Sequence, residues 1–401
     1  MELVSSAWHV VSAFLIFVAG LLWSLWLGKR FQSTRHRPWI LYLWHTLFCL
    51  AYIVFVMQFG GDAIRYFNEG VEGDIEIKFG TAAVSFLSYL FISLGNISIL
   101  GLFLVFNIFG YIGLLAFDSS LRIATADKSK RVKMLASLIV FMPSVSFWSS
   151  ALGKDALSFM AIGLSLWAAI DFRHRQGLMV LAVLVMLMVR PHIAGMMVLA
   201  LAASFVLDPK VKLKTRLISG SMAIAASVAI VPFALTYAGL GDASSAVDVE
   251  DYVNQRQGYN MEGGGGVDIA SMSLPMQLFT YLLRPVIFEA SNVTSLAAAL
   301  DNMLLLIMMV LALSSYFKKR SFRLIGQRTF MWLYVLMAWV VLATTTANLG
   351  IAVRQKWMFV PFLVFLLIPF IGKSKGRTNA ASTRMMPDTD RKKNDLASRH
   401  S

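Results

Sequence analysis

The chain has 401 residues, of which 58% are hydrophobic and only 14% are charged, and its mean hydropathy is +0.68. Soluble domains carry about 25% charged residues, so this composition excludes an ordinary soluble domain. The net charge of +14 falls in short loops between apolar blocks, which indicates membrane topology rather than binding to nucleic acid. The apolar blocks have the length of membrane spans, so we predict an all-α, polytopic transmembrane helix bundle embedded in a phospholipid bilayer.

The first two expected spans are residues 3–27 and 38–59. The loop between them contains four cations and no acidic residue: Lys29, Arg30, Arg35 and Arg37. Positively charged loops mark the cytoplasmic side, so we predict the N-terminus outside. The apolar stretch 81–117 is too long for one helix. Gly95-Asn96 divides it into a re-entrant or interfacial first part and a span that begins near residue 97.

The later apolar blocks complete a bundle of about eleven crossings, at the usual length of about 20 residues per span. They are residues 134–148, 156–170, 178–189, 193–206, 217–237, 296–316, 330–346 and 357–371. We therefore expect a membrane domain at 1–372 with a large outer loop at 239–295, in which the glycine run Gly263 to Gly266 predicts mobility. The polar, basic tail 373–401 is predicted to be disordered and cytoplasmic.

A second group of charged residues lies on the predicted outer side, where the positive-inside rule does not account for cations. It includes four arginines in four separate segments: Arg65, Arg190, Arg284 and Arg354. Arginine presents a planar fork of donors that suits phosphate, so these residues indicate an anionic ligand at the outer face. The alternative is that each arginine pairs with a carboxylate, such as Asp62 or Asp155, or with a lipid phosphate.

Two short segments carry further candidates. Asp62 follows the second span, and a helical turn there places Arg65 and Tyr66 on the same face. Its carboxylate suits a general base, although an interfacial cap beside a membrane-belt tyrosine explains the same residues. Lys154-Asp155 begins an expected helix, where Lys154 adds a cation to a helix end that favours phosphate. Asp155 is alternatively a simple helix cap.

The remaining candidates lie near helix breaks. His192 follows Arg190 across a proline and is a second candidate base or a hydrogen-bonded structural histidine. The segment from Asn348 to Lys356 joins the last two expected spans and is predicted to line the site. The sequence has no pair of histidines at helical spacing and no phosphate-binding Gly-x-x-x-x-Gly-Lys, so we expect neither a metal nor a cofactor.

Five short motifs are distributed along the membrane region: Gly61-Asp62-x-x-Arg65-Tyr66, Phe147-Trp148-Ser149-Ser150-x-x-Gly153-Lys154-Asp155, Arg190-Pro191-His192, Arg284-Pro285 and Asn348-x-Gly350-x-x-x-Arg354. Their arrangement resembles the bacterial polysaccharide polymerases of the Wzy and EpsG type, which are similar in turn to GT-C glycosyltransferases. The resemblance implies that Arg190, Arg284 and Arg354 hold a glycan on undecaprenyl diphosphate. It also implies that Asp62 is the base, supported by Lys154 and His192.

The resemblance further implies a multi-pass protein of the bacterial inner membrane with an outward-facing site, and other envelope polysaccharide-assembly proteins as partners. The product would be O-antigen, capsule or exopolysaccharide. Five residues complete the expected substrate-binding set: Arg65, Tyr66, Asp155, Asn348 and Lys356. The acidic first outer loop and the C-terminal soluble domain of GT-C enzymes are absent, so the resemblance does not extend to a metal-dependent mechanism. The alternative functions are a glycan-lipid transporter or flippase, and a non-catalytic subunit of an envelope polysaccharide complex.

Overall fold

The computed structural model describes residues 2–34, 36–73, 76, 78–207, 213–238, 255–258, 265–317 and 324–372. Within these ranges the regular elements are helices, and the one extended pairing is an isolated bridge between Gly266 and Asn348. The protein is therefore an all-helical membrane protein, as its composition predicts. The predicted tail at 373–401 and most of the loop at 239–264 lie outside the described residues.

Six helical segments of the described chain are long and apolar enough to cross a membrane. They are α1 (Ala7–Arg30), α2 (Arg37–Phe59), α5 (Ile99–Ala124), the pair α6 (Lys130–Val140) and α7 (Pro143–Ser149), α14 (Val293–Tyr316) and α15 (Arg328–Thr345). A seventh span results if Leu349–Met358 and Val360–Phe370, which are bent by 62°, are counted as one. The first six coincide with spans that the sequence predicts. The seventh only overlaps the predicted span 357–371, because its first part includes the segment that was predicted to join the last two spans.

The other four predicted spans form shorter apolar segments. These are α8 (Lys154–Ile170), α9 (Gln176–Val189), α10 (Pro191–Leu207) and the apolar segment Ile224–Phe233 of α11 (Leu213–Ala238). The helices α8, α9 and α10 have 17, 14 and 17 residues. At about 1.5 Å per residue they extend roughly 21–26 Å, less than a hydrocarbon core of about 30 Å. The described residues therefore confirm six or seven candidate spans, and not the eleven predicted.

Helix α8 forms the centre of the bundle. Every residue from Ala156 to Ala169 is buried, and the helix packs against α5 and α9. A helix that is apolar all round requires neighbours on every side, which explains this position. Gly113 of α5 and Gly163 of α8 allow the closest approach, because a Cβ on Gly163 would lie 2.3 Å from the Gly113 carbonyl oxygen.

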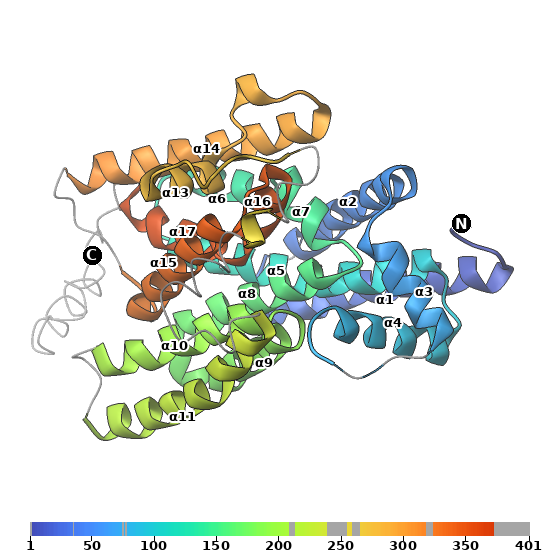
Figure 1. Ribbon diagram of the computed structural model, residues 1–401, viewed down its shortest axis with the longest axis horizontal. Coiled ribbons are helices and arrows are strands. Elements are labelled where there is room, and N and C mark those ends of the chain that lie inside the picture. The colour runs from blue at the N-terminus through green and yellow to red at the C-terminus, as the bar shows by residue number, and fades with distance from the viewer. Residues whose placement is uncertain are drawn as a thin grey trace, which may run out of the picture.

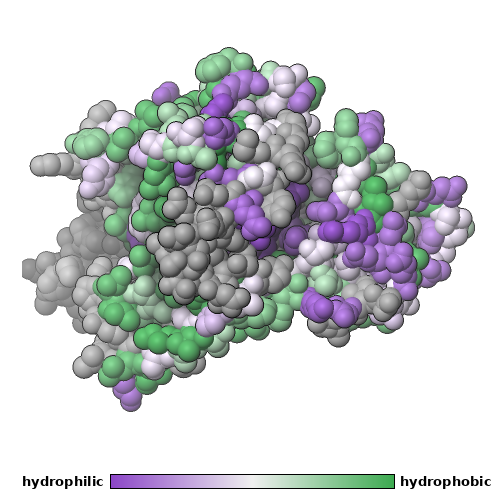
Figure 2. Space-filling model, viewed as in Figure 1, coloured by the Kyte–Doolittle hydropathy of each residue, from purple (hydrophilic) through white to green (hydrophobic). Residues whose placement is uncertain are grey.

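Shorter helices cover the predicted outer side. Helix α3 (Asp62–Glu72) packs on α4 (Thr81–Gly95), and α13 (Leu274–Leu283), η2 (Ile287–Glu289) and α16 (Leu349–Gln355) follow later in the chain (Figure 1). Helix α17 (Val360–Leu367) is instead buried in the bundle, where it packs against α15. Helix α4 ends where Asn96 adopts a left-handed φ of 43°, which asparagine tolerates, so the predicted division at Gly95-Asn96 is confirmed. Figure 2 shows hydrophilic residues over α3, whereas apolar residues dominate over α10.

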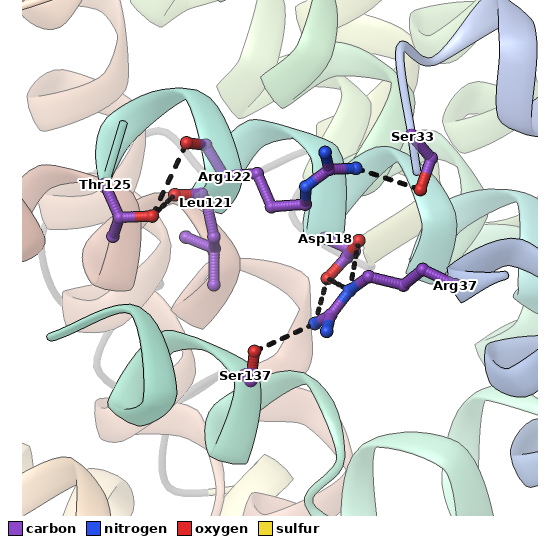
Figure 3. A network of polar contacts seen from close by, with 7 residues as sticks. All are labelled: Ser33, Arg37, Asp118, Leu121, Arg122, Thr125 and Ser137. Carbon is purple, nitrogen blue, oxygen red and sulfur yellow. Dashed lines mark hydrogen bonds and ion pairs between the residues drawn. The ribbon is translucent and has the colours of Figure 1, made fainter. Parts of the chain in front are cut away.

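Basic turns from different parts of the chain meet in one network (Figure 3). Arg37 binds Asp118 of α5 through Nε and Nη2 at 2.5–2.9 Å, and its Nη2 donates to Ser137 of α6. Arg122 of α5 donates to Ser33 in the turn after α1. The basic segments 29–37 and 122–133, which are predicted to share the cytoplasmic side, therefore lie together.

Candidate functional site

Asp155 brings together two arginines from distant parts of the chain. Nη2 of Arg190 lies 2.5 Å from its Oδ1, and Nε of Arg354 lies 3.0 Å from its Oδ2. Asp155 is the second residue of α8, Arg190 ends α9, and Arg354 lies in the last turn of α16. The cap position of α8 belongs to Gly153 and no side chain caps this end, so Asp155 serves as an ion-pair partner rather than as the predicted alternative, a helix cap.

Positive charge exceeds negative charge around this carboxylate. Lys154 lies beside Asp155, and its Nζ donates to Oγ1 of Thr81 at the start of α4. Nε of Arg190 also donates to Oγ of Ser158, one turn further along α8. Three cations therefore surround one carboxylate at the N-terminal end of a helix, where the backbone dipole also favours an anion. This arrangement suits a negatively charged ligand.

Helix α3 lies against the start of α8. Asp62 and Arg65 form an ion pair at 3.2 Å, and the Arg65 guanidinium lies 5.4 Å from the ring centre of Tyr66, so the predicted shared helical face is confirmed. Tyr66 is buried, and a Cβ on Gly153 would lie 3.4 Å from its Cε2. Burial raises the pKa of Tyr66, with Asp62 as the next cause, so its hydroxyl stays protonated at neutral pH. The Asp62 carboxylate is 54% exposed and open to an acceptor from the aqueous side.

A small pocket lies where α7, α8, α16 and η3 (Lys356–Met358) meet. It is lined by Trp148, Ser149, Asp155, Ser158, Phe159, Arg354, Trp357 and Met358. Among the described residues, Nε of Arg354 and Nε1 of Trp357 are buried donors with no hydrogen-bond partner. Arg354 is close enough to Asp155 for an ion pair without the angle of a hydrogen bond. Since a buried, unsatisfied donor typically costs about 1–3 kcal/mol, the pocket favours a ligand that brings oxygen acceptors.

Three of the predicted binding residues have partners outside this cluster. Arg284 binds Glu289 of its own turn, with 2.8 Å from Nε to Oε1, and this hydrogen bond lowers the pKa of the Glu289 carboxyl. Asn348 caps α16 by accepting hydrogen bonds from the amides of residues 350 and 351. Lys356 is fully buried and donates to Oδ1 of Asn302 in α14, so in this conformation it presents no surface to a substrate. These contacts stabilise the turns that support the pocket.

His192 is the second residue of α10 and lies among cations. Arg190, Arg256 and Lys154 all act on it electrostatically. Arg256 belongs to the short helical turn 255–258, and no sequence pattern singles it out, because the segment around it is acidic. Ser158 was also missed, although its spacing of four residues from Lys154 on one helix face was a usable signal.

The glycine run of the outer loop falls partly outside the described residues. Gly265 and Gly266 are described, and the backbone there pairs with the segment before α16: the amide of Leu349 donates to the Gly265 carbonyl at 2.9 Å. The amide of Val267 likewise donates to the carbonyl of Ala347. The C-terminal end of the predicted outer loop is therefore hydrogen-bonded to the start of α16, the helix that carries Arg354.

No family model matches this chain, and no curated protein or solved structure matches it either. The inference about function therefore rests on the residues gathered around Asp155.

Proposed function

We propose that this protein is a membrane glycosyltransferase that joins glycan units carried on a polyprenyl diphosphate at the outer face of the bacterial inner membrane. The observation that carries the proposal is the convergence of Lys154, Arg190 and Arg354 beside a pocket with open donors. A diphosphate supplies the negative charge and the oxygen acceptors that these groups favour. A polyprenyl chain lies in the bilayer, so its head group reaches a site at the ends of membrane helices.

The ion pairs of Asp155 support a binding mechanism for the diphosphate. Asp155 holds the guanidinium groups of Arg190 and Arg354 in place when no ligand is bound. Lys154 carries a third positive charge that is not paired with Asp155 by a direct contact, because its Nζ donates to Thr81. A diphosphate therefore meets an excess of preorganised positive charge, which strengthens its binding.

The proposed reaction uses the exposed carboxylate of Asp62 as general base. Asp62 takes a proton from the acceptor hydroxyl while that oxygen attacks the anomeric carbon of the donor glycan. The bond from this carbon to the diphosphate oxygen breaks, and the diphosphate leaves with the bonding electrons. Lys154, Arg190 and Arg354 stabilise the negative charge that develops on the leaving group.

The test measures polymer chain length and lipid-linked intermediates in cells that carry Arg190→Ala, Arg354→Ala or Asp62→Asn at matched expression. We expect loss of long chains and accumulation of single lipid-linked repeats on the outer side of the membrane. Arg30→Ala is the matched control, because Arg30 is exposed and lies at the C-terminal end of α1, in the basic segment that is predicted to be cytoplasmic. It should leave chain length unchanged.

The outcomes separate the enzyme from the alternatives. Accumulation of lipid-linked repeats on the cytoplasmic side would indicate a flippase and reject the polymerase. Normal chains in all three variants would reject this site and favour a non-catalytic subunit. Loss of folded protein is excluded by requiring equal amounts of each variant in the membrane fraction.

A further inference from the structure

Three buried polar residues from three helices form a chain of contacts that ends at the pocket. Nε2 of His45 in α2 lies 2.9 Å from Oγ of Ser149, the last residue of α7. Nδ1 of the same ring lies 2.6 Å from Oδ1 of Asn107 in α5. His45 and Asn107 are fully buried and Ser149 is 3% exposed. Ser149 also lines the pocket, and the proposed glycosyl transfer uses none of these three residues.

The hydrogen bonds define which nitrogen of His45 carries the proton. Nδ2 of Asn107 donates to Oγ1 of Thr46 at 2.9 Å, which orients Oδ1 toward the imidazole. Because an amide oxygen only accepts, Nδ1 of His45 carries the hydrogen and Nε2 presents its lone pair to Ser149. The Ser149 hydroxyl has a second acceptor, the Val145 carbonyl at 2.5 Å, and rotation about its C–O bond turns the hydrogen to His45.

A glycine of α5 makes the contact between the three helices sterically feasible. A Cβ on Gly110 would lie 1.8 Å from the carbonyl oxygen of Ser149 and 3.0 Å from Cε1 of His45. The backbone of α5 therefore touches the last residue of α7, and this contact holds Ser149 next to the imidazole. A nucleophile, a base within hydrogen-bond reach and a group that orients the base are the parts of an activated hydroxyl.

The pocket supplies the remaining part of such a site. Nε1 of Trp357 is a buried donor without a hydrogen-bond partner, and it lines the same pocket as Ser149. Arg354 adds a guanidinium to this lining, although its Nε is ion-paired with Asp155. Donors of this kind stabilise the oxyanion that forms when a hydroxyl attacks a carbonyl carbon. The pocket is small, so among esters it favours those with the shortest acyl groups.

We propose that Ser149 is the nucleophile of an acyl-transfer activity on short-chain esters, with His45 as general base and Asn107 as a positioning residue. Oγ of Ser149 forms a bond to the ester carbonyl carbon, and its proton moves to Nε2 of His45. The bond from that carbon to the alcohol oxygen then breaks, and the departing alcohol takes the proton from His45. An acceptor hydroxyl or water attacks the acyl-Ser149 in the same way and restores the serine.

The first experiment treats the purified full-length protein in detergent micelles with a small alkyl fluorophosphonate and locates the modified residue by mass spectrometry. We expect modification of Ser149 and none in Ser149→Ala. His45→Gln keeps a hydrogen-bonding side chain but removes the base, so it should slow labelling at least about 100-fold. Ser150→Ala is the matched control, because Ser150 is an equally buried neighbour whose hydroxyl bonds only to the Phe147 carbonyl.

Two substitutions of Asn107 test its positioning role through the labelling of Ser149. Asn107→Asp retains an acceptor for Nδ1 of His45 and should keep most of the labelling, whereas Asn107→Leu should lose it in protein that is still folded in the micelles. Absence of labelling in the wild-type protein, or equal rates in wild type and His45→Gln, would overturn the proposal. The probe contains no glycan, so this result is independent of the polymer assay and either proposal can fail alone.

Discussion

Arg190 is a buried guanidinium whose charge is balanced by a carboxylate from another helix. Its side chain is 8% exposed, and it binds Asp155 and Ser158 of α8. Removal of one partner from a buried ion pair leaves an uncompensated charge, which destabilises proteins by about 3–5 kcal/mol. Asp155 is therefore a structural requirement of the site as well as a neighbour of the proposed ligand.

We predict that Asp155→Ala lowers the free energy of unfolding by about 3 kcal/mol, because it leaves the buried Arg190 without its carboxylate partner. Asp171→Ala is the matched control, since Asp171 pairs with exposed His174 and is itself 44% exposed, and it should leave the melting temperature nearly unchanged. Thermal unfolding of both variants in detergent micelles checks the difference. Equal melting temperatures would contradict the buried ion pair.

The pair of Arg284 and Glu289 makes a prediction about pH. The pKa of Glu289 is lowered in the folded protein by its hydrogen bond from Arg284. The stabilisation of the folded state by this ionised carboxylate is therefore present above the unfolded pKa and is lost as pH falls through the folded pKa. We expect Glu289→Gln to lower the melting temperature at pH 7 and to approach the wild type as pH falls through the folded pKa of Glu289. A difference in melting temperature between Glu289→Gln and the wild type that grows as pH falls would contradict this prediction.

Helices α5 and α8 cross at two glycines, and this crossing fixes the element that carries Lys154 and Asp155. A Cβ on Gly163 would lie 2.3 Å from the Gly113 carbonyl oxygen, so any side chain there pushes the helices apart. The obstacle is backbone rather than a flexible side chain, so the contact cannot relax by a rotamer change. The close approach of α5 and α8 is thus a property of the pair and of neither helix alone.

We predict that Gly163→Ala destabilises the protein by about 1–3 kcal/mol through overpacking of this crossing. Gly177→Ala tests the same substitution in α9, where nothing lies within 4 Å of the added Cβ, and it should be neutral or slightly stabilising. The measurement is the melting temperature of each variant under identical conditions. A neutral Gly163→Ala would show that the helices are less closely packed than described.

The whole molecule has a buried centre, formed by the long helix α5 and the shorter helix α8, which other helices surround. Helix α8 is surrounded on all sides, whereas α1 exposes many apolar residues to the bilayer. Short helices are stable at the centre because neighbouring protein, rather than lipid, covers their ends. This explains why the length of α8 alone does not decide whether it crosses the membrane.

Membrane topology can be tested with single cysteines at exposed sites, because the native Cys49 is fully buried. We predict that a membrane-impermeant maleimide labels Arg65→Cys in intact cells, since α3 is placed on the outer side. Arg173→Cys, in the exposed turn η1 (Phe172–His174), should react only after permeabilisation. Labelling of both in intact cells, or the reverse pattern, would reject the predicted orientation.

The sequence by itself determined the features that depend on neighbouring residues. Long apolar runs specify helices in a bilayer, Gly95-Asn96 ends one of them, and a spacing of three and four residues places Arg65 and Tyr66 beside Asp62. Its charge pattern also predicted that the basic segments around Arg37 and Arg122 lie together.

Only the tertiary structure decided which distant residues meet. Arg190 and Arg354 share Asp155, whereas Arg284, an equally plausible candidate in the sequence, binds Glu289 of its own turn. The contacts among His45, Asn107 and Ser149 likewise carry no local signal. The physical reason is that local spacing sets the direction of a side chain on its own helix, whereas the contact between two helices depends on how their surfaces pack.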